Sequence, residues 1–157
     1  VIGQIDVAED SQVFGVALET SGLSWIRWKN GVEGLLATGG VELQHASNRL
    51  IGTEGMIEVG GKDKPPVRLL KGGKWEAPDV TRSEANATTD SVLDLVACVK
   101  SGEEPELSGR KALQATELIF ATYESSRKRG RVDLPLETTD SALLSMLDEG
   151  VIGPGRE

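Results

Sequence analysis

Trp25-Ile26-Arg27-Trp28-Lys29-Asn30-Gly31-Val32 gives the clearest local structural signal in this sequence. Large apolar residues alternate with charged ones before Asn30, which is typical of a half-buried strand. Asn30-Gly31 supplies the positive φ that a type I′ hairpin turn requires, so a second strand is expected over residues 32–38. The first strand has two faces, one made of Trp25, Arg27 and Lys29 and the other of Ile26 and Trp28. Both faces therefore carry an aromatic side chain.

Further strands are predicted on both sides of this hairpin in the first half of the chain. Gly52-Thr53-Glu54-Gly55 separates two apolar runs and predicts a tight turn between antiparallel neighbours. Arg49 is placed to pair with Glu54 or Glu58 across this turn. The predicted strands cover residues 1–7, 14–29, 32–38, 48–51, 56–59 and 67–70.

The second half of the chain is typical of helices. An apolar stripe at i, i+3, i+4 and i+7 predicts a helix over residues 81–101, which Gly102 ends. Ser108 is a candidate N-cap for a second helix over 109–128, which Gly130 ends. A strand over 131–134 and a short helix over 141–149 complete the pattern. The stripe is made of Val92, Leu95, Val96 and Val99.

Strands followed by helices predict the α+β class, with an open-faced, mainly antiparallel sheet and helices packed on one face. The other face then needs cover. If it carries Trp25 or Trp28, packing against a second copy across a two-fold axis provides that cover, so a homo-oligomer is expected. These two residues are the predicted oligomer interface.

Composition excludes several classes of protein. The 157 residues have the length of one domain, and their net charge of −8 disfavours binding to nucleic acid. The basic residues within 127–131 fall at a predicted helix C-terminus, where the dipole favours cations. No apolar run is long enough to cross a membrane, and the single cysteine, Cys98, fits a reducing, cytoplasmic setting.

Residues that commonly carry catalysis are scarce. His45 is the only histidine and Cys98 the only cysteine, and neither lies in a pattern typical of metal ligands or nucleophiles. No glycine run matches the G-x-G-x-x-G fingerprint of a dinucleotide site. The residues alone therefore predict a self-associating α+β domain, with no catalytic, metal or cofactor-binding residue of its own.

Three segments together resemble the C-terminal domain of the Gfo/Idh/MocA (glucose-fructose oxidoreductase/inositol dehydrogenase) family. They occur in the family's order and cover most of residues 1–137, which form the expected substrate and oligomerisation domain, followed by a short helix and tail over 138–157. The segments are 19–32, Asn48-Arg49-Leu50-Ile51-Gly52-Thr53-Glu54-Gly55-Met56-Ile57, and 112–136 with its ending Gly130-Arg131-Val132-Asp133-Leu134-Pro135-Leu136.

The resemblance implies a fold like the C-terminal domain of glyceraldehyde-3-phosphate dehydrogenase and a parent enzyme with a second, N-terminal Rossmann domain that holds NAD or NADP. The family's Glu-Lys-Pro and Asp-x-x-x-His motifs do not occur here and are expected upstream of Val1. The parent would transfer a hydride between the nicotinamide and a sugar or cyclitol carbon, whereas this part alone is expected to be inactive.

Within this chain the resemblance points to the strand before the Gly-Thr-Glu-Gly turn as the substrate side. Its polar residues Glu42, Gln44 and His45 are therefore the candidate substrate-lining residues, and the alternative for His45 is an exposed loop histidine. Two other functions stay open: a non-catalytic dimerisation or binding module, which explains the missing cofactor fingerprint, and a small hydrolase, which one unpatterned histidine hardly supports.

Overall fold

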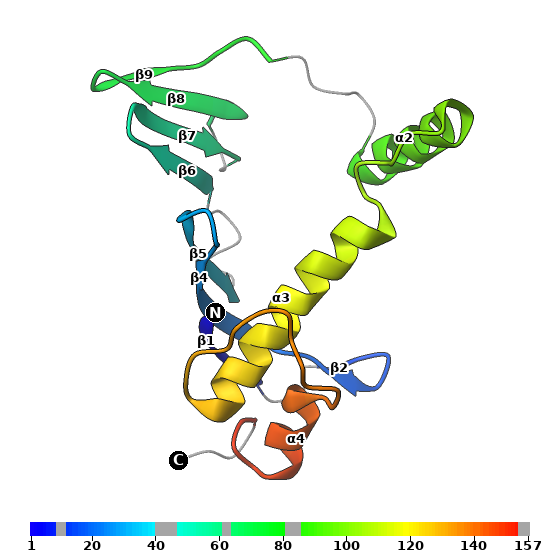
Figure 1. The fold of residues 1–157 in the computed structure, drawn as a ribbon. Helices are drawn as coiled ribbons and strands as arrows, with labels where there is room; N and C mark the ends of the chain where they lie inside the picture. The colour runs from blue at the N-terminus through cyan, green and yellow to red at the C-terminus, as the bar shows by residue number, and fades with distance from the viewer. Residues whose placement is uncertain (9–11, 40–46, 61–63, 81–85, 154–157) are drawn as a thin grey trace. The chain divides into compact units, whose positions relative to one another are not determined.

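The computed structural model describes residues 1–8, 12–39, 47–60, 64–80 and 86–153 (Figure 1). Contacts within the chain divide it into two compact units. The first is made of Val1–Gly40 with Glu104–Glu157, and the second of Val41–Glu103. Every strand pair in the described residues is antiparallel, and three helices accompany the strands, so the predicted α+β class is confirmed.

The first unit contains a three-stranded sheet in the order β1 (Ile2–Asp6), β4 (Ser21–Arg27), β5 (Glu33–Gly39). Its two faces differ in burial because side chains alternate along each strand. Ser24 and Ile26 of β4 are buried, whereas Leu23 and Trp25 are half exposed. The register places Ile2 and Leu35 beside Trp25 on the open face. An apolar face is therefore left uncovered, as the sequence predicts.

The turn between β4 and β5 differs from the predicted type I′ turn. Of the Asn30-Gly31 pair only Gly31 takes a positive φ, of 87°. The Gly31 N–H donates to the Trp28 carbonyl at 3.0 Å, and the Trp28 N–H donates to the Val32 carbonyl at 2.9 Å. A three-residue connection with a left-handed glycine is typical of a type I turn followed by a G1 bulge. The Asn30 side chain accepts from the Val32 N–H at 3.1 Å, which favours this geometry.

Helix α3 (Gly109–Lys128) packs against β1. The predicted N-cap is confirmed, because the Ser108 hydroxyl accepts from the Lys111 N–H at 3.2 Å. At the other end the left-handed residue is Arg129, with φ of 50°, rather than the expected Gly130. Gly3 allows β1 to approach the helix closely, since a Cβ at this position would lie 2.6 Å from Cγ2 of Thr122.

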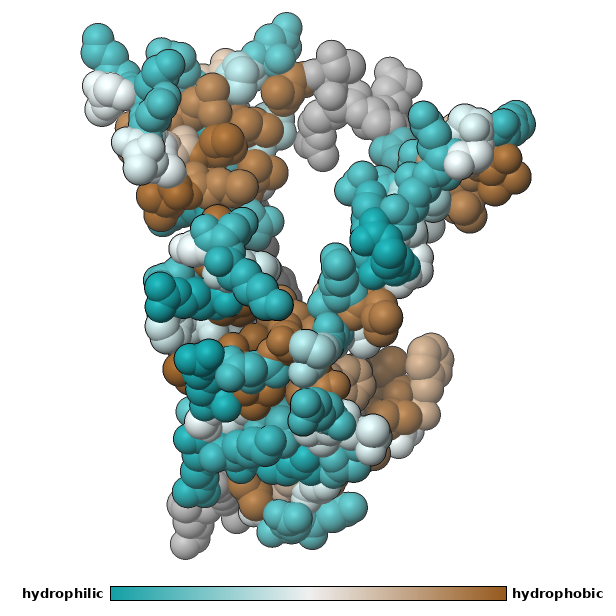
Figure 2. Space-filling model, in the orientation of Figure 1, coloured by the Kyte–Doolittle hydropathy of each residue, from teal (hydrophilic) through white to brown (hydrophobic). Residues whose placement is uncertain are grey.

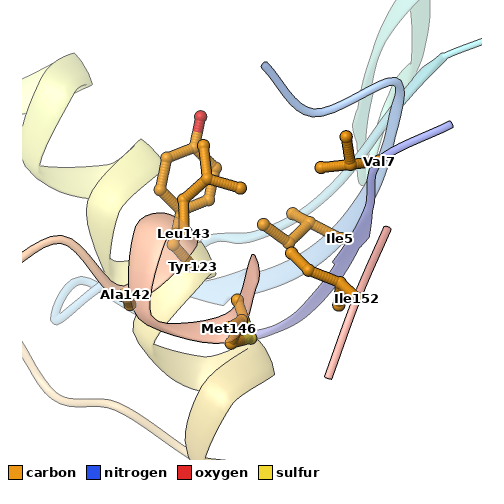
Figure 3. Close-up of a cluster of buried hydrophobic side chains, with 7 residues drawn as sticks. All are labelled: Ile5, Val7, Tyr123, Ala142, Leu143, Met146 and Ile152. Atoms are coloured by element: carbon orange, nitrogen blue, oxygen red, sulfur yellow. The ribbon is translucent and has the colours of Figure 1, made fainter. Parts of the chain in front are cut away.

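The hydrophobic core of the first unit joins β1, α3 and α4 (Ala142–Asp148) (Figure 3). Met146 of α4 is fully buried, and Ser141 caps this helix by accepting from the Leu144 N–H. The residues after α4 contribute as well, because Ile152 is buried against the same cluster. The core consists of Ile5, Val7, Tyr123, Ala142, Leu143, Met146 and Ile152.

The outer edge of β1 is closed by groups that are not strands. The Gly3 and Ile5 N–H groups donate to the hydroxyls of Ser125 and Ser126 at 2.8 and 3.2 Å. Val132 makes two backbone hydrogen bonds with Val1, of 2.9 and 2.7 Å. Residues 131–134 nevertheless do not form a strand, so the strand predicted there is wrong. Closure of an edge prevents pairing with another chain. Serine hydroxyls of α3 take the place that a full neighbouring strand would fill.

A small hairpin that the sequence does not predict joins β2 (Gln12–Val13) and β3 (Val16–Ala17) in the first unit. Phe14 and Gly15 form its turn with φ of 52° and 77°. Two successive positive φ values are typical of a type I′ turn. The Phe14 side chain at the tip is fully exposed.

The second unit contains a four-stranded meander, β6 (Asn48–Gly52), β7 (Gly55–Val59), β8 (Val67–Lys71) and β9 (Lys74–Glu76). The Gly52–Gly55 turn is confirmed, whereas β9 is not predicted. Figure 2 shows apolar surface gathered over these strands.

Helix α2 (Ala87–Ser101) belongs to the second unit and runs from its cap Asn86 to the left-handed Gly102. Its predicted end at Gly102 is confirmed, while part of the predicted first turn lies outside the described residues. The predicted apolar stripe is 45–76% exposed in this unit.

Candidate functional site

The candidate substrate-lining residues Glu42, Gln44 and His45 lie outside the described residues. The described chain resumes at Ser47, directly before β6. The Ser47 hydroxyl donates a hydrogen bond of 2.6 Å to Oε1 of Glu58 on β7. This contact leads to the most polar cluster on the second sheet.

Glu58 is the centre of this cluster and is only 1% exposed. The strand register places Arg49 of β6 and Arg68 of β8 directly beside it, one on each side. Arg68 donates from Nε to Oε2 at 2.9 Å and also from Nη2, whereas Arg49 Nη2 lies 3.5 Å from Oε1. Lys64 adds a third cation, with Nζ 3.2 Å from Oε1. One buried carboxylate therefore holds three cationic side chains.

The carboxyl group of Glu58 is strongly acidic. Hydrogen bonds from Ser47, then from Arg68 and Lys64, outweigh the effect of burial and lower its pKa to about 2. Glu58 is thus ionised at neutral pH, and the cluster of Arg49, Glu58, Lys64 and Arg68 carries a net charge of +2. We call these four residues the Glu58 cluster.

Trp75 of β9 adds an aromatic surface to the Glu58 cluster. The guanidinium carbon of Arg68 lies 4.2 Å from the centre of the Trp75 ring, within the range of a cation–π contact. Trp75 pairs with Leu70, two residues along β8 from Arg68, so both side chains belong to the same sheet face. Trp75 remains 42% exposed.

A concave surface of about 670 Å³ lies on the first unit. It extends from the open face of the sheet over the edge of β1 to the C-terminal end of α3. Its walls are mainly apolar and include Trp25, Leu23 and Leu35, with Ser126 and Arg129 as polar members. This apolar lining suits an apolar partner better than a polar substrate.

The predicted interface residues Trp25 and Trp28 lie on opposite sides of the first sheet. Trp25 is on the open face and is 43% exposed, whereas the Trp28 ring covers Gly34, which pairs with the buried Ile26. The predicted alternation is therefore confirmed. The structure brings Trp25, but not Trp28, together with the other apolar residues of the open face.

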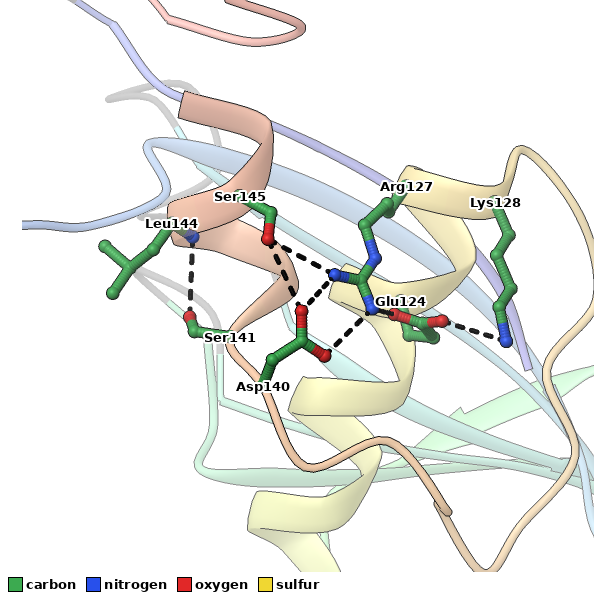
Figure 4. Close-up of polar contacts among 7 residues, drawn as sticks. All are labelled: Glu124, Arg127, Lys128, Asp140, Ser141, Leu144 and Ser145. Atoms are coloured by element: carbon green, nitrogen blue, oxygen red, sulfur yellow. Dashed lines mark hydrogen bonds and ion pairs between the residues drawn. The ribbon is translucent and has the colours of Figure 1, made fainter. Parts of the chain in front are cut away.

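The basic residues at the end of α3 are engaged in ion pairs (Figure 4). Arg127 bridges the buried Glu124 and Asp140, with 2.5 Å from its Nη1 to Oδ2 of Asp140, and Lys128 lies 2.9 Å from Glu124. Arg131 pairs with Asp133 at 2.6 Å. These pairs support the structural role that the sequence predicts for basic residues near the helix C-terminus.

Glu124 shows why Arg127 matters to this network. Burial raises the pKa of the Glu124 carboxyl, but hydrogen bonds from Lys128 and Arg127 outweigh that effect and hold the pKa below its ordinary value. The network ties α3 to the start of α4, because Arg127 also lies 3.3 Å from the Ser145 hydroxyl. Tyr123 is a core residue, and burial raises the pKa of its hydroxyl.

Within the described residues, no group of three or more His, Cys, Asp and Glu side chains is arranged to hold a metal ion. Nor does any helix in the described part of the chain have the length and apolar character needed to cross a membrane.

The sequence predicts part of the Glu58 cluster but not all of it. The tight Gly52–Gly55 turn fixes the register of β6 and β7, so the Arg49–Glu58 pair is among the predicted contacts and is confirmed. Lys64, Arg68 and Trp75 are not predicted as site residues. The alternation of charged and apolar residues in β8 is a signal for Arg68, but the longer β7–β8 connection leaves its cross-strand partner undetermined.

The comparisons with known proteins concern most of the chain. The model of the oxidoreductase family C-terminal alpha/beta domain (GFO_IDH_MocA_C) matches residues 7–134. A search of curated proteins gives no match. Among solved structures, the chain is similar to the WlbA dehydrogenase from Bordetella pertussis, determined in complex with NADH and UDP-GlcNAcA, with a TM-score of 0.55 and 23% sequence identity.

That similarity covers 86% of this chain but 40% of the dehydrogenase chain, so this chain spans less than half the length of its structural relative. At this level of identity the similarity supports the fold. The family match covers far more than half of the chain and independently supports the resemblance found in its sequence. This chain belongs to the Gfo/Idh/MocA oxidoreductase family and corresponds to its C-terminal α/β domain.

Proposed function

We propose that this chain is the substrate-binding and oligomerisation domain of an NAD(P)-dependent oxidoreductase that acts on a sugar, a cyclitol or a related hydroxyl or carbonyl compound. The family match over residues 7–134 carries this proposal. A separate Rossmann domain supplies NAD or NADP, and this domain supplies substrate contacts and a surface for self-association. The parent works in the cytoplasm, a setting that the single cysteine fits.

The proposed division of labour has support in the composition of the chain. The sequence has no dinucleotide fingerprint. The WlbA dehydrogenase, which is longer, was determined with NADH and a nucleotide sugar. Both observations agree with a sugar substrate and with a nicotinamide cofactor that the separate Rossmann domain binds.

The residues proposed to line the substrate are Glu42, Gln44 and His45, whose polar groups would read hydroxyls. Because the family's lysine and histidine motifs are expected upstream of Val1, no residue of this chain is given a proton-transfer role. The two segments of the proposed domain division are 1–137, which carries substrate contacts and oligomerisation, and 138–157, the short helix and tail.

Self-association is proposed to occur through the open face of the first sheet. Ile2, Leu23, Trp25 and Leu35 lie on this face and are 43–74% exposed, an arrangement that favours burial against a second copy. Trp28, on the other side of the sheet, is assigned a smaller part in the interface.

The experiment that tests the proposed function combines light scattering with an NAD(P)H fluorescence titration of this chain. We expect a dimer or larger assembly that has no affinity for NAD(P)H. The parent protein should oxidise sugars or cyclitols with NAD(P), which is measured as formation of NAD(P)H absorbance. A monomer of this chain that binds NAD(P)H tightly would contradict the proposal.

A non-catalytic dimerisation module is the second candidate function. The uncovered apolar face of the first sheet favours it, since that face requires no substrate. The two candidates differ in the parent protein: a parent that self-associates but reduces no NAD(P) with any sugar or cyclitol would favour the binding module.

A further inference from the structure

The Glu58 cluster has more hydrogen-bond donors than its carboxylate uses. Each arginine carries five N–H donors and each lysine three. Arg68 directs Nε and Nη2 at Glu58, whereas Arg49 and Lys64 each direct only one nitrogen at it. The Arg49 side chain is 57% exposed and the Lys64 side chain 39% exposed, so both cations are in contact with solvent as well as with Glu58.

The carboxylate also fixes where these donors lie. Arg49 Nη2 and Lys64 Nζ lie 3.5 and 3.2 Å from the same oxygen, Oε1 of Glu58, so they are at most about 7 Å apart. Like charges at this separation repel each other, and among the described residues of the cluster the Glu58 carboxylate offsets only one of the three. The arrangement favours a second anion that accepts from Arg49 and Lys64 together.

The charge balance of the sequence around the Glu58 cluster also favours binding of an anion. Residues 47–80 contain six Lys and Arg and five Asp and Glu, although the whole chain has a net charge of −8. Because its pKa is lowered, Glu58 is ionised at neutral pH, and its negative charge is included among the five acidic residues of this count. The excess of positive charge therefore persists at neutral pH in an otherwise acidic chain.

We propose that Arg49, Lys64 and Arg68, together with the Trp75 ring, form a binding site for a sugar that carries a phosphate or carboxylate group. The anionic group accepts hydrogen bonds from Arg49 and Lys64. The Trp75 ring lies against Arg68, and the exposed surface of Trp75 stacks against the sugar. Binding of the anion rests on this geometry alone, whereas its assignment as substrate rests on the proposed function.

The opposite face of the same sheet provides a matched control. Lys71 pairs with Gly55, alternates with Leu70 along β8, and is exposed. Its side chain belongs to the face opposite Arg68 and Trp75. Lys71→Gln therefore removes the same charge as Lys64→Gln from the same sheet without touching the Glu58 cluster.

The test is isothermal titration calorimetry of the chain with inorganic phosphate, glucose 6-phosphate, glucuronate and glucose. We expect the two anionic sugars to bind more tightly than glucose, and their ratio to report whether phosphate or carboxylate is preferred. Arg49→Gln and Lys64→Gln should each weaken binding of the preferred anionic sugar about tenfold, the usual effect of losing a hydrogen bond to a charged group. Lys71→Gln should leave it unchanged.

Trp75→Leu separates the two parts of the site. It should weaken binding of the preferred anionic sugar severalfold and leave inorganic phosphate unaffected. Amide NMR spectra of each variant confirm that the fold is retained. Equal affinity for glucose and the anionic sugars, or equal losses in Lys64→Gln and Lys71→Gln, would overturn the proposed site.

These titrations do not depend on hydride transfer. A parent protein without NAD(P)-dependent activity would refute the proposed function and leave the anion site standing. Conversely, an active parent whose domain binds no anionic sugar would refute this site alone.

Discussion

The hydroxyl of Ser24 on β4 lies 2.8 Å from the hydroxyl of Thr122 on α3, and both side chains are buried between sheet and helix. Thr122 also donates to the Leu118 carbonyl at 2.9 Å, so it accepts the hydrogen bond from Ser24. This pair satisfies two polar groups at the interface that supports the open sheet face.

Thr122→Val should lower the free energy of unfolding by about 1–3 kcal/mol, because the buried Ser24 hydroxyl loses its acceptor. Chemical denaturation measures this effect. Adding Ser24→Ala to the same protein should recover part of the loss, since no unpaired donor then remains. Thr116→Val is the control, because Thr116 makes the same type of helical hydrogen bond on an exposed face. An equal loss in both valine variants would contradict the role of the pair.

Gly3→Ala should destabilise the first unit by about 1–3 kcal/mol through overpacking. The new Cβ would lie 2.6 Å from Cγ2 of Thr122. Thr122→Ser removes that methyl group and should restore part of the lost stability in the double variant. Gly109→Ala, where no atom lies within 4 Å of the new Cβ, should be neutral or slightly stabilising. Thermal unfolding of the unmodified chain, Gly3→Ala, the double variant and Gly109→Ala measures these differences.

Glu58 should make stability depend on pH in the acidic range. Its folded-state pKa of about 2 lies below the ordinary value of 4.5, so its contribution is present above pH 4.5 and is lost as the pH falls toward 2. Glu58→Gln should remove this part of the pH dependence, whereas Glu54→Gln in the exposed turn should not. An NMR titration of the Glu58 carboxyl carbon measures the pKa directly, and a midpoint near 4.5 would show that the cluster does not hold the charge.

Arg127→Met should cost roughly 3 kcal/mol, because it removes one of the two cationic partners that the described residues give the buried Glu124. Asp140→Asn should cost much less, since Asp140 is 56% exposed and solvent screens its pair with Arg127. Urea denaturation of both variants provides the comparison. Similar costs would mean that the Arg127–Asp140 pair, rather than the buried Glu124, dominates the network.

Trp25→Ser should shift the assembly toward monomers if the open sheet face is the interface, because it removes the largest apolar side chain on that face. Trp28→Ser should have a smaller effect, since Trp28 lies on the opposite side over Gly34. Light scattering over a range of protein concentrations measures the change. Unchanged assembly in Trp25→Ser would place the interface elsewhere.

The sequence by itself determined the features that depend on neighbouring residues. Helix caps at Ser108 and Gly102 follow from groups within four positions along the chain, and the structure has both. The tight turn at Gly52–Gly55 likewise limited the predicted partners of Arg49 to Glu54 or Glu58, and the structure pairs it with Glu58. The α+β class followed from the order of strands and helices.

Contacts between distant parts of the chain are visible only in the tertiary structure. Hydroxyls of Ser125 and Ser126 close the edge of β1 more than 120 positions away, which no local pattern encodes. Arg68 and Trp75 reach the Glu58 cluster through strands whose register depends on a longer connection. Local propensities act over a few residues, whereas these contacts depend on how strands and helices pack, and packing is a property of the folded chain.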